Sequence, residues 1–101
     1  MKEQDFTFEE QFGVMTPEYV SYLIAKQAKE LRKRQHLTQK EVATRSGVPL
    51  PTLRYFEQTG KISLSALLNI ASVLGCLDDA SSLFKKKIVS LQEMINDEEQ
   101  N

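Results

Sequence analysis

The chain has 101 residues, which suits one domain with a modest core, and 41% of them are hydrophobic. A single cysteine, Cys76, excludes an internal disulfide and favours a reducing cytosol, and no signal peptide or membrane-spanning segment is predicted. The formal net charge of −1 at pH 7 by itself argues weakly against a nucleic-acid partner.

The charge is distributed unevenly along the chain. Residues 1–18 carry a net charge of −4, residues 19–77 a net +6 and residues 78–101 a net −3. Because a phosphate backbone responds to the local potential, the basic central segment favours nucleic acid despite the acidic total. The alternative is that these cations only solvate the first helix.

Residues 1–15 are expected to form an N-terminal arm. Phe6 and Phe8 alternate with polar residues as in a short strand, and Gly13 then interrupts the pattern. With Phe12, the arm holds three of the five phenylalanines of the chain. We therefore expect it to pack on another surface, either of its own domain or of a partner subunit.

The first helix is predicted to begin at Thr16-Pro17-Glu18, because Thr16 can cap, proline suits the first position and Glu18 complements the helix dipole. It should end near Gln35 or His36. An apolar stripe at helical spacing predicts its buried face, and this stripe consists of Val20, Leu23, Ile24, Ala28 and Leu31. The basic residues placed mostly off the stripe are Lys26, Lys29, Arg32 and Lys33.

The second helix has sequence signals at both ends. Thr38 and Glu41 have the spacing of a capping box, and Leu37 and Val42 have that of a hydrophobic staple. Gly47 then ends the helix, where a left-handed residue turns the chain.

The third helix is predicted to begin between Pro49 and Pro51, because proline is tolerated only in the first turn, and to run to about Gln58. Ser63 caps a fourth helix that Gly75 ends. Its predicted core residues are Leu64, Leu67, Leu68, Ala71 and Leu74. A fifth helix is expected to begin after Asp78 or Asp79 and to carry Phe84, Ile88, Leu91 and Ile95 on one face.

Residues 39–58 have the spacing of a helix-turn-helix. Two helices that cross closely need a small residue at the contact and a turn residue between them, and Ala43 and Gly47 occupy these positions. The apolar residues that would join the pair to the first and fourth helices are Val42, Val48, Leu53 and Phe56. This combination predicts a unit whose second helix enters the DNA major groove.

The same region resembles the lambda-repressor-like, or xenobiotic-response-element, family of transcriptional regulators. The resemblance rests on AKELRKRQHLTQKEVATRSGV, TLRYFEQTGKISLSALLNIASVLG and LDDASSLF, and it covers about 60 of the 101 residues. It implies an all-α, five-helix domain that binds DNA as a dimer. The second stretch also resembles HipB-like antitoxins, which accompany a HipA-type kinase toxin and repress their own operon. That resemblance implies a toxin protein as a further partner.

In this geometry, phosphates meet the start of the second helix and the end of the third. The predicted phosphate contacts are Thr38, Gln39, Lys40, Gln58 and Lys61. Gln39 matches the backbone-contacting glutamine of the family, whereas Thr38 also serves as a cap and the lysines can be merely solvated. The predicted base contacts, on the outward face of residues 50–58, are Leu50, Pro51, Arg54 and Tyr55.

Arg54 is the principal predicted base reader, because its guanidinium fork matches the O6 and N7 atoms of guanine. The alternative is a contact with phosphate or solvent. Leu50 and Pro51 depart from the family, in which many members carry polar residues here. Since neither side chain donates a hydrogen bond, they favour contact with thymine methyls, readout of DNA shape, or a shift towards protein binding. Pro51 is also explained simply by helix-start chemistry.

No residue is predicted to be catalytic, to bind a metal or to hold a cofactor. The lone histidine, His36, is expected at a helix end, and there is no nucleophile–base set or phosphate-binding glycine loop. Glu57 is expected to form a structural salt bridge with Arg45 or with a basic residue of the first helix.

The sequence divides into an arm (1–15), a helix-turn-helix domain (16–84) and a C-terminal helix extension with a frayed tail (85–101). The stripe Phe84, Ile88, Leu91 and Ile95 must be covered, either by folding back or, as we favour, by the same stripe of a second copy. The sequence therefore predicts a cytoplasmic, homodimeric regulator of double-stranded DNA that acts as a repressor. An antitoxin and a protein-interaction module are the alternatives.

Overall fold

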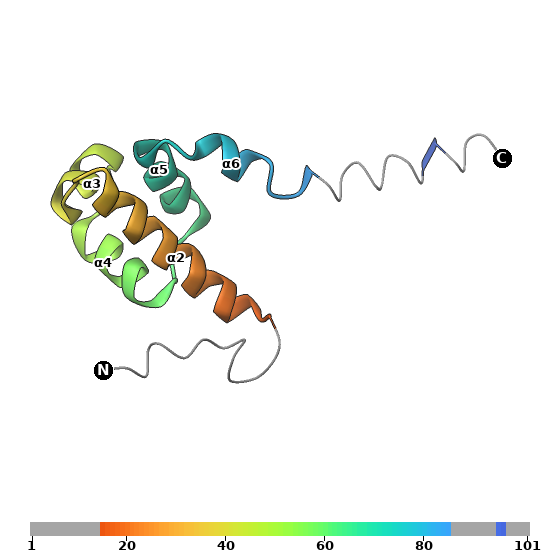
Figure 1. Cartoon of the computed structure of the whole chain (residues 1–101), viewed down its shortest axis with the longest axis horizontal. Helices are drawn as coiled ribbons and strands as arrows, with labels where there is room; N and C mark the ends of the chain where they lie inside the picture. Colours follow the sequence, from red (N-terminus) through yellow and green to blue (C-terminus); the bar gives the residue numbers. More distant parts are fainter. Residues whose placement is uncertain (1–14, 86–94, 97–101) are drawn as a thin grey trace.

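The computed structural model describes residues 15–85 and 95–96, and within them the fold is all-α, as predicted. Its five helices are α2 (Pro17–Arg34), α3 (Gln39–Ser46), α4 (Leu50–Thr59), α5 (Leu64–Leu74) and α6 (Leu77–Ser81). α2 runs diagonally through the domain, with α3 and α4 towards the left and α5 and α6 above it (Figure 1). α2 packs mainly against α4, while α3 packs against both α4 and α5.

The helix ends carry the predicted capping residues. Thr38 Oγ1 accepts a hydrogen bond from the backbone N–H of Glu41 at 3.0 Å, and Glu41 Oε1 accepts one from the backbone N–H of Thr38 at 2.8 Å. Thr16 and Ser63 cap α2 and α5 through their own side-chain oxygens. Because each such cap contributes roughly 1 kcal/mol, local chemistry fixes where these helices begin.

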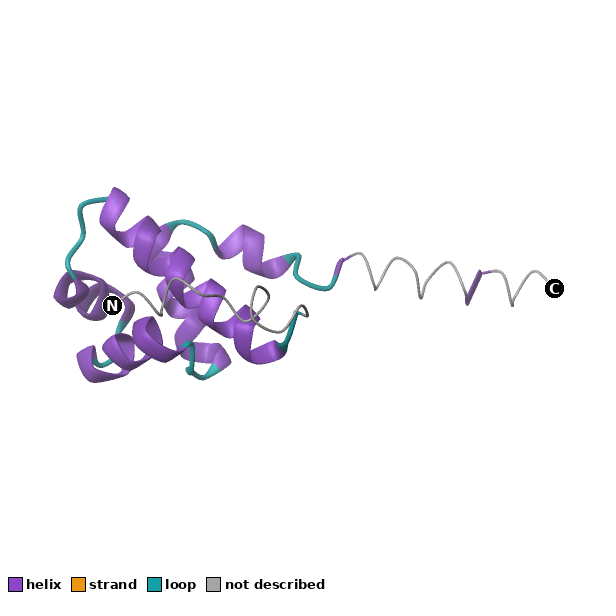
Figure 2. Ribbon diagram, turned by 60° about the horizontal axis from the view of Figure 1, so that its bottom comes forward, coloured by secondary structure: helices purple, strands orange, loops and turns teal. Residues whose placement is uncertain are grey.

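The core lies where α2, α3, α4 and α5 meet, and short loops join consecutive helices around it (Figure 2). Its buried residues are Ala25, Val42, Ala43, Val48, Leu53, Phe56, Ile70 and Leu74. Ala43 supplies the small side chain at the helix crossing, and Gly47 turns the chain between α3 and α4 with φ 76°. The predicted helix-turn-helix packing is therefore confirmed.

The backbones of α2 and α4 approach each other closely at Gly60, the residue after α4. Gly60 has φ 82°, and a Cβ atom placed there would lie 2.6 Å from the carbonyl carbon and oxygen of Ser21. Only glycine satisfies both the left-handed conformation and this contact.

The predicted buried face of α2 is wrong in part. Val20 and Ile24 are 37% and 38% exposed, whereas Tyr19, Ala25 and Arg32 are buried. α2 approaches the rest of the domain through the small Ala25, which the pattern of larger apolar residues does not reveal. Arg32, expected to lie off the buried face, is inside because a buried carboxylate pairs with it.

Two expectations for the last helices also differ from the structure. Leu64, the first residue of α5, is 69% exposed, and Ile70 is buried in its place. α6 begins at Leu77, earlier than predicted, and ends at Ser81, so Phe84 is not part of it. The expected strand of the N-terminal arm and most of the C-terminal extension lie outside the described residues, and the domain limits stay predictions.

Candidate nucleic-acid interface

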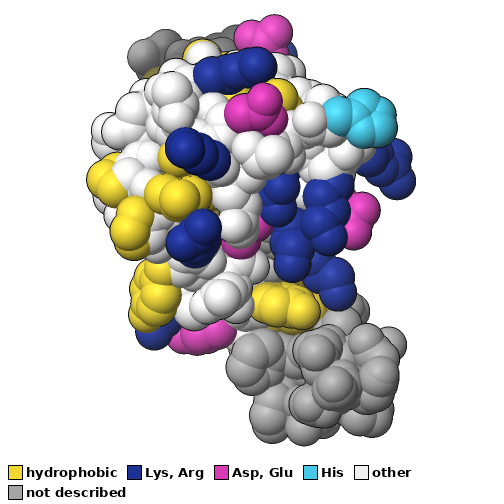
Figure 3. Space-filling model, turned by 90° about the vertical axis from the view of Figure 1, so that its left-hand side faces the viewer, with side chains coloured by type: hydrophobic (Ala, Val, Ile, Leu, Met, Phe, Trp, Pro, Cys, Tyr) yellow, Lys and Arg dark blue, Asp and Glu magenta, His cyan; other side chains and the backbone are white. Residues whose placement is uncertain are grey.

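The exposed charge on α3, α4 and the loop that follows is mainly positive. Lys40, Arg45, Arg54 and Lys61 are all exposed, whereas one of the two acids in this stretch, Glu57, is buried. Figure 3 views the side on which α3 and α4 lie, and in it Lys and Arg side chains stand singly among hydrophobic ones on the left and form a group on the right. This face can therefore attract a polyanion although the chain as a whole is slightly acidic.

α4 presents Arg54 and Tyr55 to solvent while Leu53 and Phe56 anchor it in the core. The two anchors are each 1% exposed, so the helix backbone is held firmly from within. Tyr55 is half exposed, and Nε of Arg54 donates a hydrogen bond to Oε1 of Gln39 at 3.3 Å. The predicted outward face of this helix is present around these two residues.

The start of α4 differs from the prediction in one respect. Pro51 is exposed as expected, but Leu50 is half-buried and packs against the core. Only part of the Leu50 side chain faces outward, because it closes the core at the turn between α3 and α4. Both side chains lack a hydrogen-bond donor, so these two positions offer only apolar contact.

The start of α3 brings together the three predicted phosphate contacts Thr38, Gln39 and Lys40. Lys40 is exposed, and the hydroxyl of Thr38 caps the helix. The backbone N–H of Thr38 holds the pKa of the Glu41 carboxyl below its usual value. Gln39 is half-buried, and its amide bonds to Glu57 as well as to Arg54.

The other two predicted phosphate contacts, Gln58 and Lys61, are exposed at the end of α4. The hydroxyl of Thr59 orders this turn, since it donates to the carbonyl of Tyr55 at 2.7 Å and accepts from the backbone N–H of Lys61 at 3.1 Å. The two side chains therefore project from an ordered helix end.

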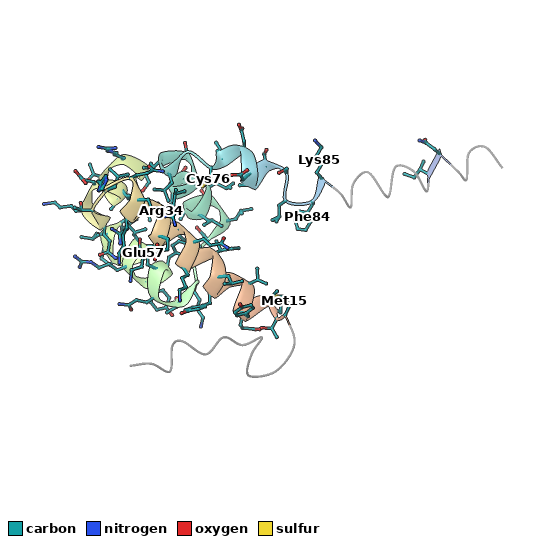
Figure 4. The ribbon with its side chains drawn as sticks, in the orientation of Figure 1. Met15, Arg34, Glu57, Cys76, Phe84 and Lys85 are labelled. Carbon is teal, nitrogen blue, oxygen red and sulfur yellow. The ribbon has the colours of Figure 1, made fainter. Side chains whose placement is uncertain are left out.

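A buried ion pair lies beneath this face. Arg32 of α2 donates from Nε to Oε2 of Glu57 at 2.8 Å and from Nη2 to Oε1 at 3.1 Å, and its Nη1 donates to the carbonyl of Leu37 at 2.9 Å. Figure 4 shows Glu57 on α4 beside α2. The predicted bridge to the first helix is confirmed, with Arg32 as partner.

Sequence reasoning missed the extension of this pair to Gln39. Nε2 of Gln39 donates to Oε1 of Glu57 at 2.8 Å, across 18 positions of the chain. No local pattern signals such a contact, although an acid at an inward position of α4 indicates that polar partners must be nearby.

The described residues offer little chemistry of other kinds. Among them, no three His, Cys, Asp or Glu side chains are grouped as metal ligands would be. Within the same residues, no helix combines the length and apolar character needed to cross a bilayer. Burial raises the pKa of the half-buried Cys76 thiol, and a protonated thiol is a poor nucleophile.

A second exposed surface is apolar and lies at the C-terminal side of the domain. A groove of about 840 Å³ is lined mainly by Leu64, Leu68, Leu77, Leu83 and Phe84. Of the predicted dimerisation residues, Phe84 and Ile95 are exposed, and Ile88 and Leu91 lie outside the described residues. In Figure 4, Phe84 lies past α6, away from α3 and α4.

Comparison with known families agrees with this geometry. A sequence model of the helix-turn-helix family matches residues 29–78, which span the end of α2 through the start of α6. Neither the comparison with curated proteins nor that with solved structures gave a match to the chain. The matched segment contains the α3–α4 pair, its core and the exposed cations. The chain therefore belongs to the lambda-repressor-like, or xenobiotic-response-element, family of DNA-binding helix-turn-helix domains.

Proposed function

We propose that the protein is a cytoplasmic, sequence-specific transcriptional repressor that reads the major groove of double-stranded DNA with α4. The observation that carries this proposal is the exposed Arg54 on a helix that Leu53 and Phe56 fix in the core, with exposed cations on both sides. Family membership supports the same reading.

The proposed contacts divide into two groups. Arg54 donates to the O6 and N7 atoms of a guanine, while Tyr55, Pro51 and the exposed part of Leu50 contact thymine methyls. Contacts with phosphates fix the register and come from Thr38, Gln39, Lys40, Gln58 and Lys61. We assign no catalytic, metal or cofactor role to any residue.

The repressor is proposed to act as a homodimer. The apolar groove with Leu83 and Phe84 supports this, because these two side chains are 71% and 60% exposed and a second copy would bury them. Two copies of α4 would then enter successive major grooves about 34 Å apart and read a palindrome. Phe84→Asp should convert the dimer to a monomer in sedimentation equilibrium, and an unchanged dimer would place the interface elsewhere.

Selection of binding sites from a pool of random DNA duplexes tests the DNA-binding proposal. The protein should enrich a palindromic sequence, and log K should fall with log salt at a slope of about −7 if each subunit makes about four phosphate contacts. Arg54→Ala should relax one base position in each half-site, whereas Lys40→Ala should weaken all sequences alike. No enrichment, or a flat response to salt, would contradict the proposal.

A second candidate function is that of an antitoxin, which binds a HipA-type toxin and represses its own operon. Besides the resemblance of residues 52–75 to such antitoxins, the apolar groove at α5 and α6 is separate from the exposed cations of α3 and α4. In this alternative the groove holds the toxin in place of a second copy, so that one chain can bind toxin and DNA together. Co-purification with the product of a neighbouring gene would support it, and a chain without partners would contradict it.

A third candidate is a protein-interaction module on the same scaffold. The apolar residues Leu50 and Pro51 at the start of α4 support it. It predicts that the selection fails even at low salt while a partner protein still binds. Alanine at either position would then weaken that protein complex.

A further inference from the structure

A chain of side-chain hydrogen bonds runs from the core to the outer face of α4. It begins with the buried Arg32–Glu57 pair, continues through the amide of Gln39 and ends at the guanidinium of Arg54. These residues come from α2, α3 and α4, so three helices contribute to one continuous network.

The orientation of the Gln39 amide follows from its partners. The carboxylate of Glu57 only accepts hydrogen bonds, so the NH2 group of Gln39 must face it, at 2.8 Å. The amide oxygen is then turned towards Arg54, whose Nε–H donates to it at 3.3 Å. Since Arg32 holds both carboxylate oxygens of Glu57, the amide is fixed from the core side.

This arrangement determines which edge of Arg54 is presented outward. With Nε bonded to Gln39, the two terminal NH2 groups remain available as a fork, and a fork can donate two parallel hydrogen bonds to one guanine. An arginine held in this way loses less side-chain freedom on binding than an unrestrained one.

We propose that Gln39 is a positioning residue that sets base specificity through Arg54, with the Arg32–Glu57 pair as its anchor. This inference rests on the proposed DNA-binding function. It differs from a phosphate contact by Gln39, which would use the second N–H of Nε2 and strengthen the binding of every sequence equally.

The test compares full-length wild type with Gln39→Met, Arg54→Ala and the double variant in binding to a random duplex pool. Methionine keeps the length of the side chain without the amide. Gln27→Met is the matched control, since Gln27 is exposed on α2 and lies outside both the network and the proposed DNA contacts. The position read by Arg54 is the one at which Arg54→Ala loses its preference for guanine.

Wild type should favour guanine at that position by about 5- to 150-fold, the range of a good bidentate pair. Gln39→Met should lower this preference about two- to tenfold, as expected when a side chain must be ordered on binding, and leave other positions unchanged. Gln27→Met should keep the preference. In the Arg54→Ala background, Gln39→Met should change no base preference.

Two results would overturn the inference while leaving DNA binding intact. One is an unchanged guanine preference in Gln39→Met at full affinity. The other is an unchanged guanine preference with an even loss of affinity for all duplexes, which is the result of losing a phosphate contact alone. If wild type enriches no sequence at all, the proposed function fails and the inference fails with it.

A second measurement needs no DNA. The {1H}–15N NOE of the Arg54 Nε–H should be high in the free wild-type protein and low in Gln39→Met, while that of Arg32 stays high in both. An equally mobile Arg54 in the two proteins would overturn the inference. A high NOE at Arg32 also shows that the variant is folded.

Discussion

The α3–α4 unit and the α6 end of the domain differ in how completely each is stabilised from within. α3 has a capping box, and α3 and α4 together bury Val42, Leu53, Phe56 and the Glu57 carboxylate. α6 has no side-chain cap and no buried residue, and Leu83 and Phe84 after it are largely exposed. The first region is ordered without a partner, whereas the second offers apolar surface to one.

The largest expected effect contrasts two phenylalanines. Phe56→Ala should lower the free energy of unfolding by about 3–5 kcal/mol, because it empties a fully packed site. Phe84→Ala should change it by no more than about 0.5 kcal/mol in the monomer, since that ring is already exposed. Urea unfolding at a concentration where the protein is monomeric measures both, and comparable losses would mean that Phe84 belongs to the core.

Two glycines with the same backbone conformation provide the next contrast. Gly60→Ala must pay the left-handed penalty of about 1–2 kcal/mol and also displace the backbone of Ser21, which adds about 1–3 kcal/mol. A Cβ atom at Gly75 would have no atom within 4 Å, so Gly75→Ala carries only the penalty of the left-handed conformation. Thermal and urea unfolding of both variants should therefore rank Gly60→Ala as the more destabilised, and equal losses would refute the close approach of α2 and α4.

Much of the α3–α4 unit is predictable from sequence because its signals are local. Thr38, Glu41 and Gly47 act on residues at most four positions away, and the structure confirms the helix bounds that they predict. Val42, Leu53 and Phe56 are predictable as core for a related reason, since two helices joined by a tight turn can face each other in only one register.

The rest depends on partners distant in the sequence. Arg32 and Glu57 are 25 positions apart, and no local pattern distinguishes the buried Arg32 from the exposed Lys33 and Arg34 that follow it. The rotation of α2 that buries Ala25 and exposes Ile24 is set by α4 and α5. Leu64 is misassigned because helical spacing gives a face but does not tell whether a neighbouring helix reaches its first turn.

A smaller, stabilising effect is expected at His36, between α2 and α3. This exposed residue has φ 60°, a conformation that costs a residue with a Cβ atom about 1–2 kcal/mol. Glycine removes this cost but gives the unfolded chain more conformational entropy, which cancels part of the gain. His36→Gly should therefore raise the free energy of unfolding by a net amount of about 0.5–1 kcal/mol. His36→Ala keeps the Cβ atom and should give no gain in stability. An equal gain in His36→Ala would show that the effect comes from removing the imidazole and not from relieving the backbone conformation.

The smallest expected effect is a pH dependence within the capping box of α3. The pKa of Glu41 is held below its ordinary value of 4.5, chiefly by the backbone N–H of Thr38, so the native state favours the carboxylate. Its contribution to stability is fully present above pH 4.5 and is lost as the pH falls through the lower native pKa.

Glu41→Gln can still accept the hydrogen bond but does not titrate. The difference in unfolding free energy between wild type and this variant should thus change as the pH falls below 4.5 and level off once the native carboxyl is protonated. A constant difference over this range would show that the carboxylate of Glu41 gains nothing from the box, and that the hydrogen bonds of the cap act independently of charge.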